Sequence, residues 1–400
     1  MHSDQDLCSI LLGRDSSLFE LDLQMYRKQI SDKVCQSKFL VLGAAGTIGR
    51  ALTKALIQFK PIKLHLVDLS ENNLAELTRD LRSTHEYSQA KFKTFAVDVG
   101  STEFDALWRD NYDYDYVINL CALKHVRSEK DPYTLMRMIK TNILNTKKTL
   151  ELAAENGSTK YFAVSTDKAT NPENLMGATK AIMEAYLVEG SDNMVVSSAR
   201  FANVLFSDGS LLDSFRKRLE KMQPITAPQN VRRYFICEKE AGELCLISTI
   251  LSENREIIFP RLGTHFQPMT FPDLAKRYLK TRGFQPKVFE KEAEARRYII
   301  TPKKSKIWPC YWSMSDTTGE KEIEEFYTQN DDVNYEKFKN IGVILRQRDD
   351  FQDKIRTFED KLKFHLENQS WQKRDLVNML SDFLPEMHHN EVGKSLDDKM

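Results

Sequence analysis

The sequence predicts an α/β protein built on a doubly wound parallel sheet, because short apolar runs alternate with longer helical patterns over its first half. Apolar residues recur at helical spacing between these runs, for example in residues 50–59 and 141–155. Six runs have the length and composition of buried strands: residues 38–43, 63–68, 91–97, 114–120, 160–165 and 193–199. Strands that are separated by helices pair in parallel, so each helix is expected to cross from one strand to the next.

This alternation ends near residue 205, and the chain is expected to divide into four parts. Residues 1–36 are predicted as an N-terminal helical arm, and residues 37–205 as the domain that holds the sheet. Residues 206–330 mix short helices with proline-containing loops, which is typical of a smaller substrate lobe, and parts of it can return to the sheet. Residues 331–400 are strongly charged and are predicted as a helical extension with a disordered tail from residue 388. Two amphipathic helices are expected there from two apolar stripes: Phe351, Ile355, Phe358, Leu362 and Leu366, then Leu376, Met379, Leu380 and Phe383.

Composition excludes several classes of function. Lys+Arg and Asp+Glu both number 58, which argues against the basic face that non-specific nucleic-acid binding needs. The six cysteines show no C-x-x-C spacing, so neither a metal site nor a disulfide framework is expected. No apolar run reaches the ~18–20 residues of a membrane span, and the N-terminus lacks the pattern of a signal peptide. We therefore expect a cytoplasmic protein without a membrane span.

A glycine-rich turn, GAAGTIG at residues 43–49, follows the first predicted strand and opens a predicted helix near Thr47. Glycines at positions 43, 46 and 49 let the backbone turn tightly and approach a pyrophosphate, whose charge the helix N-terminus stabilises. A glycine triplet is a weak signal by itself, but this strand and helix provide the context in which it binds a dinucleotide.

The ends of the next strands carry further groups that suit a dinucleotide. Asp68 ends the second strand, where a carboxylate accepts hydrogen bonds from the ribose hydroxyls and repels a 2′-phosphate, which favours NAD over NADP. Asp98 ends the third strand and can meet the adenine amino group, although an ordinary aspartate at a strand end fits the sequence nearly as well. Lys124 and His125 are predicted as substrate residues, because ligands of such sheets bind along the carboxyl edge. The predicted cofactor residues so far are Gly43, Gly46, Thr47, Ile48, Gly49, Asp68, Asp98, Val99, Cys121, Ala122 and Leu123.

Four blocks of sequence identify a family resemblance: GAAGTIG; ALKHV with KTNILNT; STDKATNPENLMGATK; and RFANVLFSDGS followed by VRRYF. With these blocks the chain resembles the extended short-chain dehydrogenase/reductases, which have the Rossmann fold. Within that group it resembles the UDP-N-acetylglucosamine 4,6-dehydratases of bacterial polysaccharide and capsule synthesis. Two weaker matches, LLGRD and TTGEKEIEEF, extend the resemblance over roughly residues 10–328. Some members carry N-terminal membrane helices, and this chain resembles the forms without them.

The resemblance implies an NAD-dependent dehydration of UDP-N-acetylglucosamine to a UDP-4-keto-6-deoxy-N-acetylhexosamine. The sugar is oxidised at carbon 4, loses water across carbons 5 and 6, and regains hydride at carbon 6. The resemblance assigns Thr166 to orient the sugar, Asp167 as the acid for the 6-hydroxyl, and Lys168 as the base at carbon 5. A base needs a lowered lysine pKa, which partial burial and the nearby cation Lys180 could provide.

Met176 stands where many members have the tyrosine of a Tyr-x-x-x-Lys pair, and it is a variant that other members share. Lys180, one helical turn later, is expected on the same face and is implied to bind the nicotinamide ribose. Because Met176 can only pack, we hypothesise that Asp167 accepts the 4-hydroxyl proton, directly or through water. An ordinary core methionine remains an alternative for Met176.

Residues of the second half are implied to bind the substrate. Asn203 and Ser210 match positions that hold the diphosphate and nucleotide, and Arg233 matches an arginine that pairs with the diphosphate, where a planar guanidinium can chelate two oxygens. Two departures can reshape the pocket: Phe206 stands where members often have glycine, and residues 317–318 are Thr-Thr where members often have Arg-Pro.

Two other functions suit the same fold. A nucleotide-sugar 4-epimerase relies on the tyrosine and does not need the Asp-Lys pair, so Met176 beside Asp167 and Lys168 favours dehydration. A non-catalytic NAD-binding sensor or scaffold is compatible with Met176, but the intact Asp167, Lys168 and Lys180 argue against it. The expected partners are a UDP-sugar and further copies of the chain in a homo-oligomer. Retention or inversion at carbon 5 does not follow from the sequence.

Overall fold

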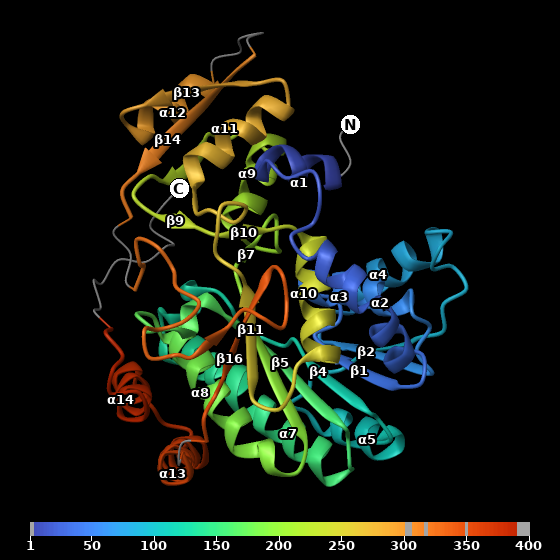
Figure 1. Cartoon of the computed structure of the whole chain (residues 1–400). Coiled ribbons are helices and arrows are strands. Elements are labelled where there is room, and N and C mark those ends of the chain that lie inside the picture. Colours follow the sequence, from blue (N-terminus) through green and yellow to red (C-terminus); the bar gives the residue numbers. More distant parts are fainter. Residues whose placement is uncertain (1–3, 301–305, 316–318, 349–350, 390–400) are drawn as a thin grey trace.

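A large mixed sheet with helices on both faces forms the centre of the molecule (Figure 1). The computed structural model of the chain describes residues 4–300, 306–315, 319–348 and 351–389. Within these ranges, nine strands form the sheet, in the order β15-β16-β11-β6-β5-β4-β1-β2-β3. The strands are β1 (Lys38–Leu42), β2 (Lys63–Asp68), β3 (Lys93–Ala96), β4 (Tyr116–Asn119), β5 (Lys160–Thr166), β6 (Val195–Phe201), β11 (Glu256–Pro260), β15 (Val333–Asn334) and β16 (Ile341–Leu345).

The predicted doubly wound parallel sheet is confirmed. The strands from β11 across to β3 pair in parallel, while β16 joins β11, and β15 joins β16, in antiparallel fashion. From β1 the chain proceeds in one direction through β2 and β3, and then returns to build β4, β5 and β6 on the other side. The order reverses between β1 and β4, and ligands of such sheets bind in the crevice at this point.

Helices cover both faces because the strands present apolar side chains alternately to each side. In β1, Phe39 and Val41 belong to one apolar cluster, whereas Leu40 and Leu42 belong to another. The helices that contribute to the first cluster are α2 (Glu20–Val34), α3 (Thr47–Ile57), α4 (Glu71–Ser83) and α10 (Glu238–Leu251). Those of the second are α5 (Thr102–Asn111), α7 (Asn145–Glu155) and α8 (Leu175–Glu189).

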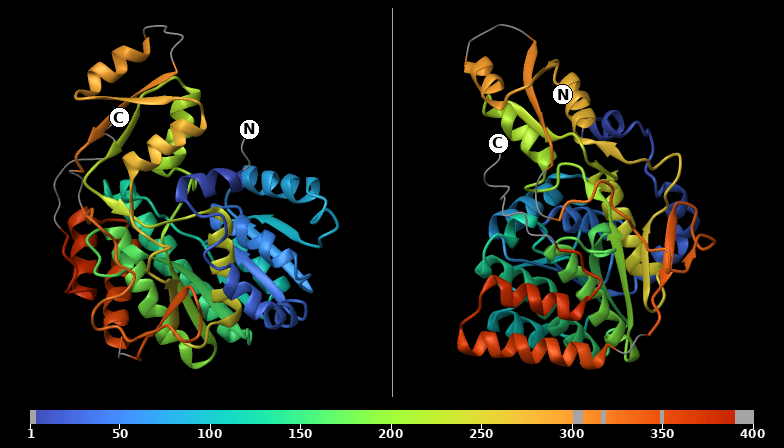
Figure 2. Two further views of the ribbon diagram at one scale, coloured as in Figure 1. Left: turned by 45° about the horizontal axis from the view of Figure 1, so that its top comes forward. Right: turned by 90° about the vertical axis from the view of Figure 1, so that its left-hand side faces the viewer.

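A smaller lobe stands beyond one end of the sheet (Figures 1 and 2). Its three-stranded parallel sheet, ordered β13-β14-β8, packs with helices around Phe215 and Leu274. Leu7 and Leu11 join this lobe's core, so the predicted N-terminal arm contributes to both parts of the molecule. Elements of the lobe are α1 (Asp4–Leu12), α9 (Leu211–Glu220), β8 (Ile225–Pro228), α11 (Phe271–Thr281), β13 (Gln285–Phe289), α12 (Glu292–Ile300) and β14 (Ile307–Ser313). Two short pairs connect it to the main body: β7 (Asn203–Val204) with β10 (Phe235–Ile236), and β9 (Arg232–Arg233) with β12 (Met269–Thr270).

The start of the predicted helical extension is wrong. Residues 333–345 contain β15 and β16, which complete the edge of the main sheet. Ile341, Val343 and Ile344 are buried there, and their pairing with β11 outweighs the charged composition of the surrounding sequence. The predicted disordered tail, residues 388–400, lies outside the described residues from 390 onward.

Two amphipathic helices follow, as the apolar stripes predict: α13 (Gln352–Asn368) and α14 (Lys373–Phe383). Phe358 and Leu380 belong to an apolar cluster that also contains residues of α6 (Pro132–Ile139) and α8. Tyr186 of α8 donates a hydrogen bond to Glu359 at 3.0 Å. The two helices therefore pack on the outer side of α6 and α8.

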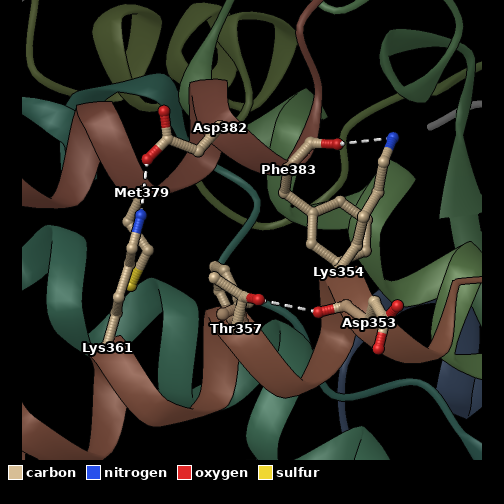
Figure 3. Close-up of a pocket in the computed structure, with 8 residues that line it drawn as sticks. Asp353, Lys354, Thr357, Lys361, Met379, Asp382 and Phe383 are labelled. Carbon is tan, nitrogen blue, oxygen red and sulfur yellow. Dashed lines mark hydrogen bonds and ion pairs between the residues drawn. The ribbon is translucent and has the colours of Figure 1, made fainter.

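A groove of about 240 Å³ runs between α13 and α14 (Figure 3). Lys361 and Asp382 form an ion pair of 2.7 Å across it, and Lys354 donates to the carbonyl oxygen of Phe383 at 3.4 Å. None of its lining residues belongs to the site that the sequence predicts, so this groove is not the expected ligand crevice.

Candidate active site

The glycine-rich turn has the geometry of an anion site. Gly43 has a φ of +76°, and a Cβ atom there would lie 2.9 Å from the backbone nitrogen of Cys121. A Cβ atom on Gly49 would lie 2.3 Å from the carbonyl oxygen of Gly43. Gly46 is the N-cap of α3 and has no side chain to accept the first N–H groups of the helix. These N–H groups and the helix dipole therefore suit a pyrophosphate.

Carboxylates follow β2 and β3 at the same edge of the sheet. Asp68 accepts hydrogen bonds from the backbone nitrogens of Ala45 and Ser70, both at 2.9 Å, which holds its carboxylate beside the glycine-rich turn. Asp98 is exposed and accepts a hydrogen bond from the nitrogen of Gly100 at 2.8 Å. Their placement suits the adenosine half of a dinucleotide.

The loop after β4 is positioned by a buried amide that the sequence reasoning missed. Asn142 is fully buried in the π-helical turn η2 (Lys140–Leu144), and it bonds both the nitrogen and the carbonyl oxygen of Leu123, at 2.9 and 3.1 Å. It also donates to Thr179 of α8 at 2.9 Å. The sequence offered one signal for Asn142: it is a polar residue inside an apolar helical pattern, in the stretch KTNILNT. Burial raises the pKa of Cys121 to about 12, so the thiol of this loop is neutral.

Met176 and Lys180 lie on α8 and are both buried, at 3% and 4% exposure. Met176 belongs to the apolar cluster of α6, α8 and α14, so its side chain packs in the core. Lys180 Nζ donates to the carbonyl oxygen of Val164 at 3.0 Å, and burial lowers the pKa of Lys180 to about 8. A lysine with further N–H groups beside the sheet edge suits a ribose.

A charged cluster lies at the end of β5. Thr166 ends the strand, and Asp167 and Lys168 form a short 3₁₀ turn after it, η3 (Asp167–Ala169). Asp167 Oδ1 accepts hydrogen bonds from Thr166 Oγ1 and from Lys168 Nζ, both at 2.9 Å. Lys168 Nζ also donates to Asn203 Oδ1 at 3.4 Å. The other carboxylate oxygen, Asp167 Oδ2, is buried and has no hydrogen-bond partner among the described residues, which marks it as a place for a ligand donor.

The sequence reasoning missed Glu324, a carboxylate that is only 3% exposed. Its Oε1 lies 3.6 Å from Lys168 Nζ and 3.6 Å from Arg233 Nη2. Glu324 comes from the TTGEKEIEEF stretch, where it is one of four glutamates within six residues. Nothing local in the sequence distinguishes it from its exposed neighbours.

The predicted lowering of the Lys168 pKa is wrong. Burial lowers it, but the carboxylates of Asp167 and Glu324 outweigh burial, so the pKa of Lys168 is raised. The cation that opposes this rise is Arg233, and not Lys180 as the sequence suggested. Lys168 is therefore an ammonium ion at neutral pH in this cluster.

Arg233, predicted as a diphosphate ligand, is 3% exposed and anchors the segment that carries Glu324. Its Nη1 donates to the carbonyl oxygen of Lys321 at 2.9 Å, and its Nη2 donates to Glu320 at 3.2 Å. Arg233 and Asn203 thus join Asp167 and Lys168 in one cluster.

The remaining predicted substrate residues lie around the loop at 206–210. Ser210 is the N-cap of α9, where its hydroxyl accepts a hydrogen bond from the nitrogen of Asp213 at 3.2 Å. Lys124 and His125 are exposed, and a Cβ atom on Gly209 would lie 3.0 Å from His125 Nε2. Phe206 has a φ of +54°, a left-handed conformation that a glycine adopts without strain. Residues 317–318 lie outside the described part of the chain.

In the described part of the chain, no group of three or more His, Cys, Asp or Glu side chains could hold a metal ion. Likewise, no helix within the described ranges is long and apolar enough to cross a membrane.

Comparison with known proteins gives a family match over most of the chain. The family described as polysaccharide biosynthesis protein matches residues 39–346. The capsular polysaccharide biosynthesis protein CapD of Staphylococcus aureus is 32% identical over 278 residues, which is 68% of this chain and 44% of that relative. This chain thus spans less than half of CapD.

Other relatives are matched over more of their length. A UDP-N-acetylglucosamine 4,6-dehydratase (inverting) of Campylobacter jejuni is 30% identical over 250 residues, 60% of this chain and 70% of the relative. A protein of Methanocaldococcus jannaschii named as an uncharacterised membrane protein is 29% identical over 328 residues, 79% of this chain and 88% of the relative. Among solved structures, Pen from Bacillus thuringiensis matches with a TM-score of 0.64 at 20% identity, over 78% of this chain and 88% of that one. That structure supports the fold.

Proposed function

Because this chain belongs to the polysaccharide biosynthesis protein family of extended short-chain dehydrogenase/reductases, we propose that it is an NAD-dependent nucleotide-sugar 4,6-dehydratase. Its substrate is UDP-N-acetylglucosamine, and its product is a UDP-4-keto-6-deoxy-N-acetylhexosamine. One observation carries the proposal: a buried aspartate, Asp167, with an unpartnered oxygen beside an ammonium ion at the carboxyl edge of the sheet. Together these groups can move the protons that the reaction requires.

NAD fits the residues that the chain presents. The glycine-rich turn takes the pyrophosphate, Asp68 takes the adenosine ribose, and Lys180 donates to the nicotinamide ribose. When bound, NAD accepts hydride from carbon 4 of the sugar and donates it to carbon 6. We assign the sheet domain to this cofactor and the smaller lobe, with Asn203 and Arg233, to the UDP-sugar.

The proton chemistry falls to the cluster at the end of β5. Asp167 Oδ2 accepts the proton of the 4-hydroxyl, the task that a tyrosine performs in many relatives, and Thr166 orients the sugar. Asp167 returns a proton to the 6-hydroxyl as it leaves. The ammonium ion of Lys168 stabilises the negative charge that develops on the oxygen at carbon 4 when the carbon 5 proton is removed.

Incubation of the protein with NAD and UDP-N-acetylglucosamine, followed by NMR of the sugar, tests the proposal. A 4-keto-6-deoxy product is expected. A sugar with inverted configuration at carbon 4 would instead indicate an epimerase. An unchanged sugar, with NAD bound, would indicate a sensor or scaffold.

Asp167→Asn removes the proposed proton acceptor and keeps the shape of the side chain. We expect oxidation at carbon 4 to slow by about 10²–10⁴-fold, the range for loss of a general base. Reduced-cofactor absorbance in a single turnover measures this step. Asp192→Asn is the matched control, because Asp192 is half exposed and pairs with Arg348 on the surface. A normal single turnover in D167N would contradict the role of Asp167.

A further inference from the structure

Three oxygens converge on the amino group of Lys168. They belong to Asp167 Oδ1 at 2.9 Å, Asn203 Oδ1 at 3.4 Å and Glu324 Oε1 at 3.6 Å. All three are acceptors, and an ammonium ion has three N–H donors and no acceptor. A neutral amine would instead turn a lone pair toward one of these oxygens. The geometry therefore holds Lys168 in its charged form, with one N–H donated to Asp167 Oδ1 and the carboxylate of Glu324 in ion-pair contact at 3.6 Å.

Glu324 is held in place by the segment around it. The nitrogen of Arg232 donates to the carbonyl oxygen of Glu322 at 2.8 Å, and Lys321 Nζ donates to the carbonyl oxygen of Thr170 at 2.8 Å. Two residues after Glu324, the buried Phe326 accepts a hydrogen bond from Arg200 at 2.7 Å through its carbonyl oxygen. The carboxylate of Glu324 is thus fixed between Lys168 and Arg233.

The charged groups that face Glu324 come from three segments. They are Lys168 and Asp167 after β5, Arg233 on β9, and Lys321 on its own segment. Burial is the largest influence and raises the pKa of Glu324; Asp167 raises it further, while the three cations lower it. The result is a raised pKa, so this carboxylate takes up a proton more readily than an ordinary glutamate.

The reaction needs two proton acceptors. Two protons leave the sugar, from the 4-hydroxyl and from carbon 5, and two return, to the departing 6-hydroxyl and to carbon 5. Met176 accepts none, and Lys168 is already protonated. Asp167 alone cannot hold both protons, so a second group within reach must store one.

We propose that Glu324 is the second proton acceptor of the site and that Lys168 relays protons to it from Asp167. This inference rests on the proposed dehydration. The first proton passes from the 4-hydroxyl to Asp167. Lys168 first gives a proton to Glu324, so an N–H bond breaks on Lys168 and an O–H bond forms on Glu324. The neutral amine that results has a lone pair and takes the proton from Asp167, so the O–H bond on Asp167 breaks and an N–H bond forms again on Lys168. No electrons are exchanged, and Lys168 is an ammonium ion before and after.

The relay restores the carboxylate of Asp167, which removes the carbon 5 proton and delivers it to the departing 6-hydroxyl. The stored proton then returns from Glu324 through Lys168 and Asp167 to carbon 5. The balance closes, with two protons lost and two regained. Glu324 acts through Lys168 and needs no contact with the sugar.

Glu324→Gln tests the relay because the amide keeps the shape but cannot accept the proton. Oxidation at carbon 4 needs only Asp167, so single-turnover formation of the reduced cofactor is expected to persist. Elimination is expected to slow by about 10²-fold or more, measured by deuterium exchange at carbon 5 and by NMR of the product. Glu325→Gln is the matched control, since Glu325 is the next residue, is exposed and bonds Asn171 at 3.1 Å. It is expected to behave as wild type.

A measurement on the protein without substrate tests the contact itself. Removal of the Glu324 charge lowers the pKa of Lys168, and NMR titration of isotopically methylated lysines reads this shift in E324Q against E325Q. An unchanged Lys168 titration would overturn the inference.

The turnover outcomes separate the two proposals. Elimination at the wild-type rate in E324Q, or an equal loss of carbon 4 oxidation, overturns the relay and leaves the dehydration standing. A wild-type protein that forms no 4-keto sugar overturns the dehydration and the relay together.

Discussion

The two halves of the proposed site, one assigned to the cofactor and one to the sugar, are built in different ways. The cofactor half depends on a seven-residue turn, residues 43–49, whose binding groups are backbone N–H groups. The sugar half depends on charged side chains from separate segments: Asp167 and Lys168 after β5, Arg233 on β9, and Glu324 in a loop. A local turn can be recognised from its own residues, whereas the protonation states of a cluster depend on which distant charges the fold brings together.

Two buried lysines show this difference most clearly. Lys180 has no ion pair with a carboxylate among the described residues, and burial lowers its pKa to about 8. Lys168 is held between Asp167 and Glu324, and its pKa is raised. Burial acts in the same direction on both, so the nearby carboxylates decide the outcome.

The strongest test of the backbone-built half is Gly49→Ala. A Cβ atom at this position would meet Gly43 O at 2.3 Å and Ala44 O at 2.6 Å, and backbone atoms cannot move aside as a flexible side chain can. We expect NAD affinity to fall about 100-fold, because overpacking a tight site costs about 1–3 kcal/mol. Isothermal titration with NAD measures the change.

Gly263→Ala, outside the glycine-rich turn, is the control for this test. A Cβ atom there would have no atom within 4 Å of it, so its NAD affinity is expected to stay that of the wild type. Equal NAD affinities of the two alanine variants would contradict the backbone-built description.

Much of the fold was predictable because its signals are local. The strand at Lys63–Asp68 has the bounds expected from its apolar run, and the glycine-rich turn follows β1 as expected. Residues 333–345 were mistaken for part of a helical extension, because their strands are short and are stabilised by pairing with β11, far away in the sequence.

For the candidate site, whose roles stay predictions, the sequence singled out residues that the fold brings together. Thr166, Asp167 and Lys168 stood in a recognisable signature, and Asn203 and Arg233 lie in the same cluster. Glu324 was not predicted because its contacts with Lys168 and Arg233 depend on the fold. Its neighbours in the sequence give no sign of them.

Lys180→Met sharpens the contrast between the two lysines. The pKa of Lys180 is about 8 in the folded protein against an ordinary 10.5, so between these values the unfolded chain binds more protons than the folded one. Stability therefore rises with pH through this window, and below about pH 8 the full cost of burying the charge is present. We expect K180M to raise the free energy of unfolding of the protein without NAD by about 2–3 kcal/mol at pH 7. Above pH 10.5, where Lys180 is neutral in the folded and the unfolded protein, this gain in stability is expected to disappear.

Chemical denaturation at neutral and at alkaline pH measures the free energy of unfolding of K180M and of the wild type under both conditions. Lys33→Met is the comparison variant, because Lys33 is exposed and donates to the carbonyl oxygen of Ile250 near the end of α10. A K180M protein that is less stable than wild type at pH 7 would show that Lys180 has a compensating partner in the folded state.

Met176→Tyr tests whether the sugar half can be restored to the commoner tyrosine chemistry, and its expected effect is the smallest. Met176 is 3% exposed within the apolar cluster of α6, α8 and α14, so a larger ring must displace its neighbours and bury a phenol. We expect a loss of about 1–2 kcal/mol in the free energy of unfolding and no gain in the rate of carbon 4 oxidation. Met176→Leu, close in volume, is expected to cost under about 1.5 kcal/mol and to keep the wild-type rate. A faster single turnover in M176Y would mean that the phenol reaches the 4-hydroxyl, and Asp167 would then not be the group on which the first proton transfer depends.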